Sequence, residues 1–203
     1  MTSPSALRYD TYYHIYNRGV NHENIFIEER NYFYFLNLYN KYIEPIADTF
    51  AYSLLRNHFH ALVRIRTEEE IIKTLRVSKT LRVSEPSIQF SNFFNAYAKA
   101  INKAYGRSRS LFQHPFGRVP VINSTQFYRV GLYIHQNPQK NNFVEDFKEW
   151  KYSSYGMLLF SNPTYLLRET VIDWFGSLDQ FTRQHADWVA ERESTWFPED
   201  DDD

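Results

Sequence analysis

Two histidines separated by one residue, His58 and His60, have the spacing of a metal-binding pair. Residues 51–66 are rich in aliphatic and aromatic side chains and lack Gly and Pro, so they predict two short strands joined by a turn at Arg56-Asn57. Side chains two positions apart on a strand share a face. Both imidazoles can therefore reach one divalent ion while Phe59 turns into the core.

A tyrosine and an asparagine lie one helical turn apart, at Tyr133 and Asn137. Apolar residues recur at helical spacing before them, Asn123 or Ser124 can cap the start, and Pro138 predicts the helix end at Asn137. Residues at i and i+4 share a helix face, so a phenol and a carboxamide oxygen can enter the same site. The amide would be a third metal ligand.

Together these groups suit attack on a DNA phosphodiester. Mg²⁺ or Mn²⁺ on His58, His60 and Asn137 would polarise a phosphoryl oxygen and orient the leaving 3′ oxygen. Tyr133 would be the nucleophile, although a phenol with a pKa of about 10 needs help to lose its proton and the sequence does not show the helper. A tyrosine ester preserves the energy of the phosphodiester, so a free 3′ hydroxyl can rejoin the strand.

Four segments extend this pattern over residues 8–160. They are YYHIYNRG at 12–19, LLRNHFHALV at 54–63, YIHQNP at 133–138 and WKYSSY at 150–155. In this order they resemble the REP-associated tyrosine transposases, members of the single-tyrosine HUH transposases (His, hydrophobic residue, His). The resemblance implies a ferredoxin-like fold, a 5′-phosphotyrosine intermediate, and a single-stranded hairpin substrate with a short flanking guide sequence.

The resemblance also implies further site residues. In related transposases the third metal ligand is often Gln or another polar residue on the tyrosine helix, so Gln136 competes with Asn137, although only Asn137 shares the face of Tyr133. His135 faces away from Tyr133 and is expected to pack. The expected DNA contacts, including two arginines of the basic stretch described next, are His14, Asn17, Arg18, Arg107, Arg109, Gln113, His114 and Arg118.

The charge of the chain is divided. Residues 71–140 hold eleven Lys and Arg against one acid, a net charge of +10, whereas residues 169–203 hold two bases against eleven acids, a net charge of −9. Basic stretches commonly neutralise phosphates, so the first segment predicts DNA binding. The acidic residues 199–203 are either a solvated end or a mimic that competes with DNA.

Composition limits the class of protein. The 203 residues, 43% hydrophobic and 18% aromatic, predict one globular domain over residues 1–160 with a helical and acidic extension over 161–203. The absence of cysteine excludes disulfides and cysteine zinc sites. We find no membrane-spanning apolar run and no signal-peptide layout at the N-terminus, so we expect a cytoplasmic protein, monomeric or dimeric.

The expected order of elements is typical of an α+β fold. We expect a strand at 12–18, a helix at 28–43, the two strands of 51–66, a helix at 90–105, an extended segment at 111–122 and the tyrosine helix. This order suits an antiparallel ferredoxin-like sheet with packed helices. The repeated string KTLRVS, at 73–78 and 79–84, is too short for a solenoid and is interpreted as an insertion in a basic connection or helix end.

Two other classes remain open. One is a domesticated, catalytically inactive nucleic-acid-binding module, against which the retained Tyr133 argues. The other is a metal-dependent hydrolase that uses the histidines with carboxylates, although neither local motif contains one.

Overall fold

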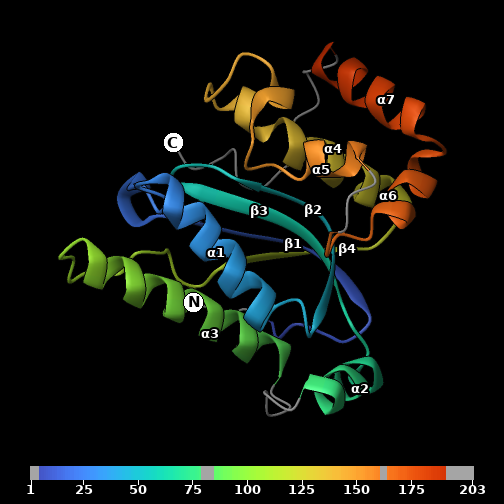
Figure 1. Ribbon diagram of the computed structural model, residues 1–203. Helices are drawn as coiled ribbons and strands as arrows, with labels where there is room; N and C mark the ends of the chain where they lie inside the picture. Colours follow the sequence, from blue (N-terminus) through green and yellow to red (C-terminus); the bar gives the residue numbers. More distant parts are fainter. Residues whose placement is uncertain (1–4, 79–84, 161–163, 191–203) are drawn as a thin grey trace.

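A four-stranded antiparallel sheet forms the centre of the molecule (Figure 1). The computed structural model describes residues 5–78, 85–160 and 164–190. The strands are ordered β2-β3-β1-β4, and their bounds are β1 (Thr11–Arg18), β2 (Ala47–Leu54), β3 (His58–Ile65) and β4 (Gly117–Val121). This order, with helices after the first and third strands, is that of a ferredoxin-like sheet, and the predicted α+β class is confirmed.

Helices α1 (Glu29–Tyr42) and α3 (Pro86–Ala104) cover one face of the sheet (Figure 1). Phe35 on α1 and Phe94 on α3 both contact Phe59 on β3, with ring centroids 5.1 and 5.7 Å apart. The predicted helix at 90–105 begins four residues earlier than expected, because Pro86 occupies the first helical turn, where its missing N–H costs nothing. It ends before Gly106, whose φ is 64°.

Helix α4 (Ser124–Lys140) covers the other face of the sheet. The sequence predicted Asn123 or Ser124 as the cap, and the Asn123 side chain takes this role by accepting a hydrogen bond from the Gln126 N–H at 2.8 Å. The predicted end at Asn137 is wrong by three residues, because Pro138 lies inside the helix. The bias against helical geometry before proline is modest, and the buried packing of these two residues overrides it.

Three C-terminal helices pack on the α4 side of the sheet (Figure 1): α5 (Tyr155–Leu159), α6 (Arg168–Phe175) and α7 (Leu178–Ala190). Phe175 and Phe181 belong to the same hydrophobic core as the sheet. The predicted boundary at residue 160 stays a prediction. Short 3₁₀ turns, η1 (Val20–His22) and η2 (Phe147–Glu149), complete the connections.

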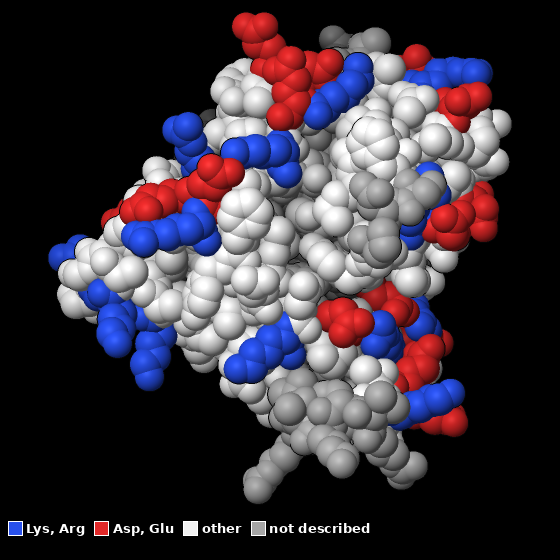
Figure 2. All heavy atoms as spheres, in the orientation of Figure 1, with Lys and Arg blue, Asp and Glu red and all other residues white. Residues whose placement is uncertain are grey.

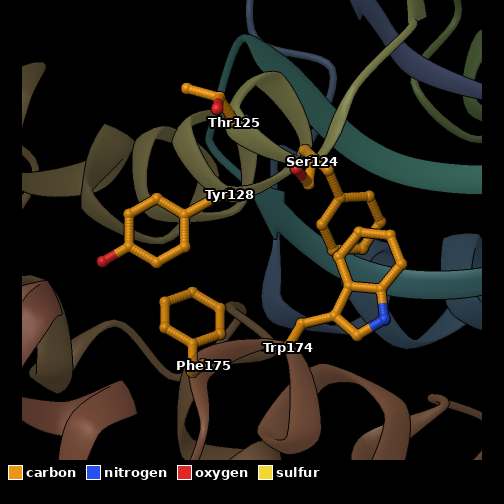
Figure 3. Close-up of a pocket in the computed structure, with 6 residues that line it drawn as sticks. Ser124, Thr125, Tyr128, Trp174 and Phe175 are labelled. Atoms are coloured by element: carbon orange, nitrogen blue, oxygen red, sulfur yellow. The ribbon is translucent and has the colours of Figure 1, made fainter.

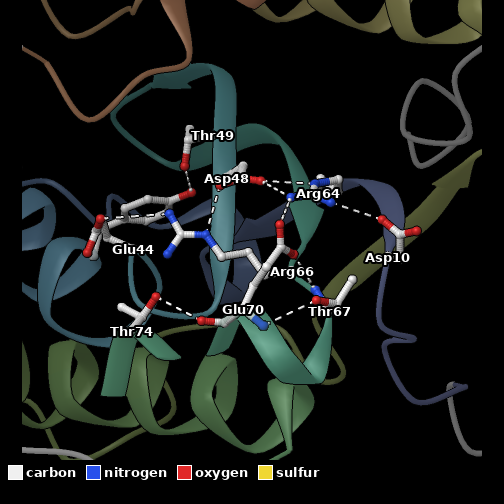
Figure 4. A network of polar contacts seen from close by, with 10 residues as sticks. Asp10, Glu44, Asp48, Thr49, Arg64, Arg66, Thr67, Glu70 and Thr74 are labelled. Atoms are coloured by element: carbon white, nitrogen blue, oxygen red, sulfur yellow. Dashed lines mark hydrogen bonds and ion pairs between the residues drawn. The ribbon is translucent and has the colours of Figure 1, made fainter. Parts of the chain in front are cut away.

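Helix α2 (Glu68–Ser78) is tied to one end of the sheet by an ionic network (Figure 4). Asp48 accepts hydrogen bonds from Arg64 at 2.6 and 2.9 Å and from Arg66 at 2.8 Å. Glu70 on α2 accepts from Arg64 at 3.0 Å. Arg64 is six residues from His58 on β3, about 20 Å along an extended strand, so this network is remote from the histidines.

The expectations for the repeated string KTLRVS and for the acidic end fall partly or wholly outside the described residues. The first KTLRVS copy ends α2, whereas the second copy lies outside the described residues, as does the acidic end at 199–203. Within the described ranges, no helix is both long and apolar enough to cross a membrane.

Candidate active site

The pleat of the sheet brings a set of polar residues to the face under α4. In the antiparallel register, Arg18 is paired with His58 and Tyr16 with His60, so these four side chains point to one face. His14, two residues before Tyr16, shares that face. Strand pairing thus builds the floor of the candidate site from β1 and β3.

His58 contacts Asn137 directly. Its Nδ1 lies 2.7 Å from Asn57 Oδ1, and its Nε2 lies 2.9 Å from Asn137 Oδ1. Asn137 Oδ1 also accepts from Asn141 Nδ2 at 3.2 Å. Burial lowers the pKa of His58 to about 4, so the ring is neutral at pH 7. Both amide oxygens only accept, so the single N–H of the neutral ring can donate to only one of them.

His60 is supported from behind by His14. His14 Nε2 and His60 Nδ1 lie 3.1 Å apart, so one of them donates to the other. Burial lowers the pKa of His14 to about 3 and that of His60 well below its usual value, so both rings are neutral. His14 is only 2% exposed, and the structure gives it a partner inside the protein instead of a surface position for DNA.

Tyr133 meets the same histidines from α4. Its ring stands edge-on to His60 and His14, with centroids 5.4 and 5.9 Å away. Lys140, which the sequence reasoning did not select, places its Nζ 5.3 Å from the centroid of the Tyr133 ring. Spacing of seven residues on one helix puts two side chains on the same face, and this spacing is a signal by which the sequence could have revealed Lys140.

The two candidates for a third ligand point in different directions. Asn137 Oδ1 faces His58, whereas the Gln136 side chain donates a hydrogen bond to the His185 carbonyl oxygen on α7. Adjacent residues on a helix are about 100° apart, so the side chains of Gln136 and Asn137 point to different faces of α4.

A buried chain of hydrogen bonds holds the outer face of α4. His185 Nδ1 donates to the Phe181 carbonyl at 2.7 Å, so His185 Nε2 accepts from His135 Nδ1 at 2.8 Å. His135 Nε2 in turn accepts from the Ser154 hydroxyl at 2.8 Å. Ser154, from the WKYSSY segment, also accepts from the Tyr52 N–H on β2 at 2.8 Å. Sequence reasoning expected His135 to pack but did not find its partner His185.

Of the other residues expected to contact DNA, Asn17 and Arg118 lie on the opposite face of the sheet. Asn17 is paired with Phe59 and is 4% exposed, and its Oδ1 accepts from the Arg18 N–H at 2.8 Å. Arg118 is paired with Ile15 and stacks on Phe116 at 3.6 Å. Neither side chain lies with the histidines.

The remaining expected contacts lie in or beside the segment that follows α3. Arg107 forms an ion pair with Glu23. Arg109, Gln113 and His114 are exposed, and the Gln113 N–H donates to the Arg18 carbonyl at 2.8 Å. That bond places this segment beside the end of β1, where Arg18 and the histidines lie.

Two further features bear on where a ligand binds. Among the described residues, no group of three or more His, Cys, Asp or Glu side chains is arranged to hold a metal ion. A cavity of about 440 Å³ lies between the start of α4 and α6 (Figure 3), lined by Ser124, Thr125, Phe127, Tyr128, Trp174 and Phe175. It contains none of the site residues.

Comparisons with known proteins identify a related fold. No family model matches the sequence, and no curated protein matches it. A solved structure described as a REP-associated tyrosine transposase bound to a REP hairpin is similar, with a TM-score of 0.54 and 14% sequence identity. The similarity covers 77% of this chain and 83% of that one. At this identity it shows the fold alone.

Proposed function

We propose that this chain is a single-tyrosine HUH strand transferase that cleaves and rejoins single-stranded, REP-like hairpin DNA. The observation that carries the proposal is that Tyr133 and Asn137 on α4 meet His58 and His60 on β3. The Tyr133 and His60 ring centroids lie 5.4 Å apart, and His58 Nε2 lies 2.9 Å from Asn137 Oδ1. The fold shared with a hairpin-bound tyrosine transposase supports the same reading.

The donor set fits Mg²⁺ or Mn²⁺. His58 and His60 are neutral, so each ring has one nitrogen lone pair that can bind a metal ion, and His58 Nε2 lies 2.9 Å from the Asn137 oxygen. The ligand atom of His60 would be Nε2, because Nδ1 is bonded to His14. When bound, the ion would polarise a phosphoryl oxygen.

The protein residues carry the covalent step. The Tyr133 hydroxyl oxygen forms a bond to phosphorus while the bond from phosphorus to the 3′ oxygen breaks. The phenolic proton passes to solvent and the 3′ oxygen takes one from solvent, leaving a 5′-phosphotyrosine and a 3′ hydroxyl. Attack by another 3′ hydroxyl reverses the step and rejoins a strand.

Incubation with labelled hairpin DNA tests the proposal. A panel of stem–loop oligonucleotides with single-stranded flanks is mixed with the full chain and Mg²⁺ or Mn²⁺, and products are run on a denaturing gel. We expect a protein-linked band that chelator prevents. Tight hairpin binding without any adduct would instead support an inactive binding module, and free cleaved DNA without adduct would support a hydrolase.

A further inference from the structure

Two cations approach the histidine pair from different elements. Arg18 ends β1 and is paired with His58, so its side chain lies on the histidine face. Lys140 ends α4, with Nζ 5.3 Å from the Tyr133 ring centroid. Both cations therefore lie on the side of the sheet that carries the histidines and Tyr133.

Arg18 differs from the arginines at the other end of the sheet. Arg64 and Arg66 share the carboxylate of Asp48. In the described part of the chain, no Asp or Glu forms an ion pair with Arg18. A guanidinium that forms no ion pair with a described carboxylate favours an anion such as phosphate.

We propose that Lys140 and Arg18 hold the non-bridging oxygens of the phosphate that Tyr133 attacks. This inference rests on the proposed function. Lys140 lies two turns after Tyr133 on the same helix face, so it is positioned with the nucleophile, whereas Arg18 is positioned with the histidines. Negative charge increases around phosphorus as the tyrosine oxygen attacks and the 3′ oxygen leaves. The two cations therefore stabilise the transition state more than the bound hairpin.

Charge-removing variants test the role in the reaction. With the hairpin that gives most adduct, Lys140→Gln and Arg18→Gln should each slow adduct formation by roughly 100-fold, the usual effect of removing one preorganised donor. Hairpin affinity should change only a few fold, because many phosphates contribute to it. Lys140→Arg should recover most of the rate, since the charge is kept.

Lys41 provides a matched control. Its Nζ lies 5.2 Å from the Tyr42 ring centroid, the same kind of contact, but on α1 across the sheet. Lys41→Gln should form adduct at the wild-type rate.

A hairpin with an uncharged group in place of the attacked phosphate tests whether Lys140 and Arg18 contact that phosphate or only help to position other residues. In a Tyr133→Phe background, which cannot cleave, the affinity for the normal hairpin is compared with that for a hairpin carrying a methylphosphonate at the cleavage position. Binding should favour the charged phosphate, and adding Lys140→Gln or Arg18→Gln should reduce that preference.

The outcomes distinguish the two proposals. Wild-type adduct rates in both glutamine variants, or an unchanged preference for the charged phosphate, would overturn the phosphate contact and leave the proposed function standing. Absence of adduct from the wild-type protein, with every hairpin tested, would overturn the proposed function itself.

Discussion

At the scale of single residues, two tyrosines face the histidine pair. The Tyr133 ring centroid lies 5.4 Å from that of His60, and the Tyr16 centroid lies 6.1 Å from it. Tyr133→Phe keeps the ring but removes the oxygen that we propose attacks the phosphate, so the covalent adduct should vanish while hairpin affinity stays within a few fold. Tyr16→Phe is the control on the same face and should still form adduct on a denaturing gel. The reverse pattern would move the nucleophile to β1.

Successive side chains of β3 point to opposite faces of the sheet, so substitutions at neighbouring positions should affect either metal binding or stability. His58→Ala and His60→Ala should each abolish cleavage and weaken Mn²⁺ binding, measured by electron paramagnetic resonance of the free ion. Phe59, 1% exposed between α1 and α3, points to the other face. Phe59→Ala should lower the free energy of unfolding by about 3 to 5 kcal/mol, measured by urea denaturation. Full cleavage by His60→Ala in chelator would refute the metal role.

At the scale of elements, α7 holds the tyrosine helix through His185. Substitution His185→Leu leaves the buried His135 N–H without its partner, and a buried polar group left unpaired costs about 1 to 3 kcal/mol. We expect a lower free energy of unfolding at pH 7.5 and slower adduct formation. Arg183→Ala, at an exposed position of the same helix, should change neither.

His185→Leu should also change how the free energy of unfolding depends on pH. Burial lowers the pKa of His185 from 6.5 to about 3, so the folded protein holds this ring neutral while the unfolded chain protonates it. The stability that this histidine provides is complete above pH 6.5 and declines below it. Between pH 7.5 and 5.5 the decline is about 1.4 kcal/mol. Urea denaturation at both values should show a smaller acid loss in His185→Leu, and an equal loss would show that His185 charges within the fold.

At the scale of the whole molecule, basic side chains gather at one end. Figure 2 shows them at the lower left, at the C-terminal end of α3, with acidic side chains above them. Lys99 and Lys103 on α3 are exposed, as is Arg109 just beyond it. The segment after α3 continues to Gln113, which bonds to Arg18 at the histidine end of the sheet. A hairpin stem lying on this end would reach the candidate site.

Salt dependence tests that placement. Each phosphate contact on the duplex stem contributes about 0.9 to the slope of log affinity against log salt. Replacing Lys99, Lys103 and Arg109 by Gln together should reduce the slope by about 2.7. Lys148→Gln, which removes a lysine paired with Asp146, is the control and should leave it unchanged. An unchanged slope in the triple variant would place the DNA elsewhere.

Local sequence determined the type and order of the main elements. Apolar alternation in residues 51–66 and helical spacing before Tyr133 are properties of neighbouring residues, so the β2–β3 hairpin and the Asn123 cap were predictable. The end of α4 was not, because Pro138 sets only a local bias and tertiary burial decided its place. Helical spacing also put Asn137, rather than Gln136, on the face of Tyr133, where it meets His58.

Only the tertiary structure decided which distant residues meet. Register between β1, β3 and β4 put Arg18 beside His58 but turned Asn17 and Arg118 to the opposite face. Packing of α7 on α4 brought His185 to His135 across fifty residues of chain. Strand register and helix docking depend on contacts between segments far apart in sequence, and no local pattern encodes the partner of a given residue. For that reason the sequence by itself determined which residue types the candidate site contains and which strand or helix each lies on. The fold determined which cations and hydrogen bonds surround them.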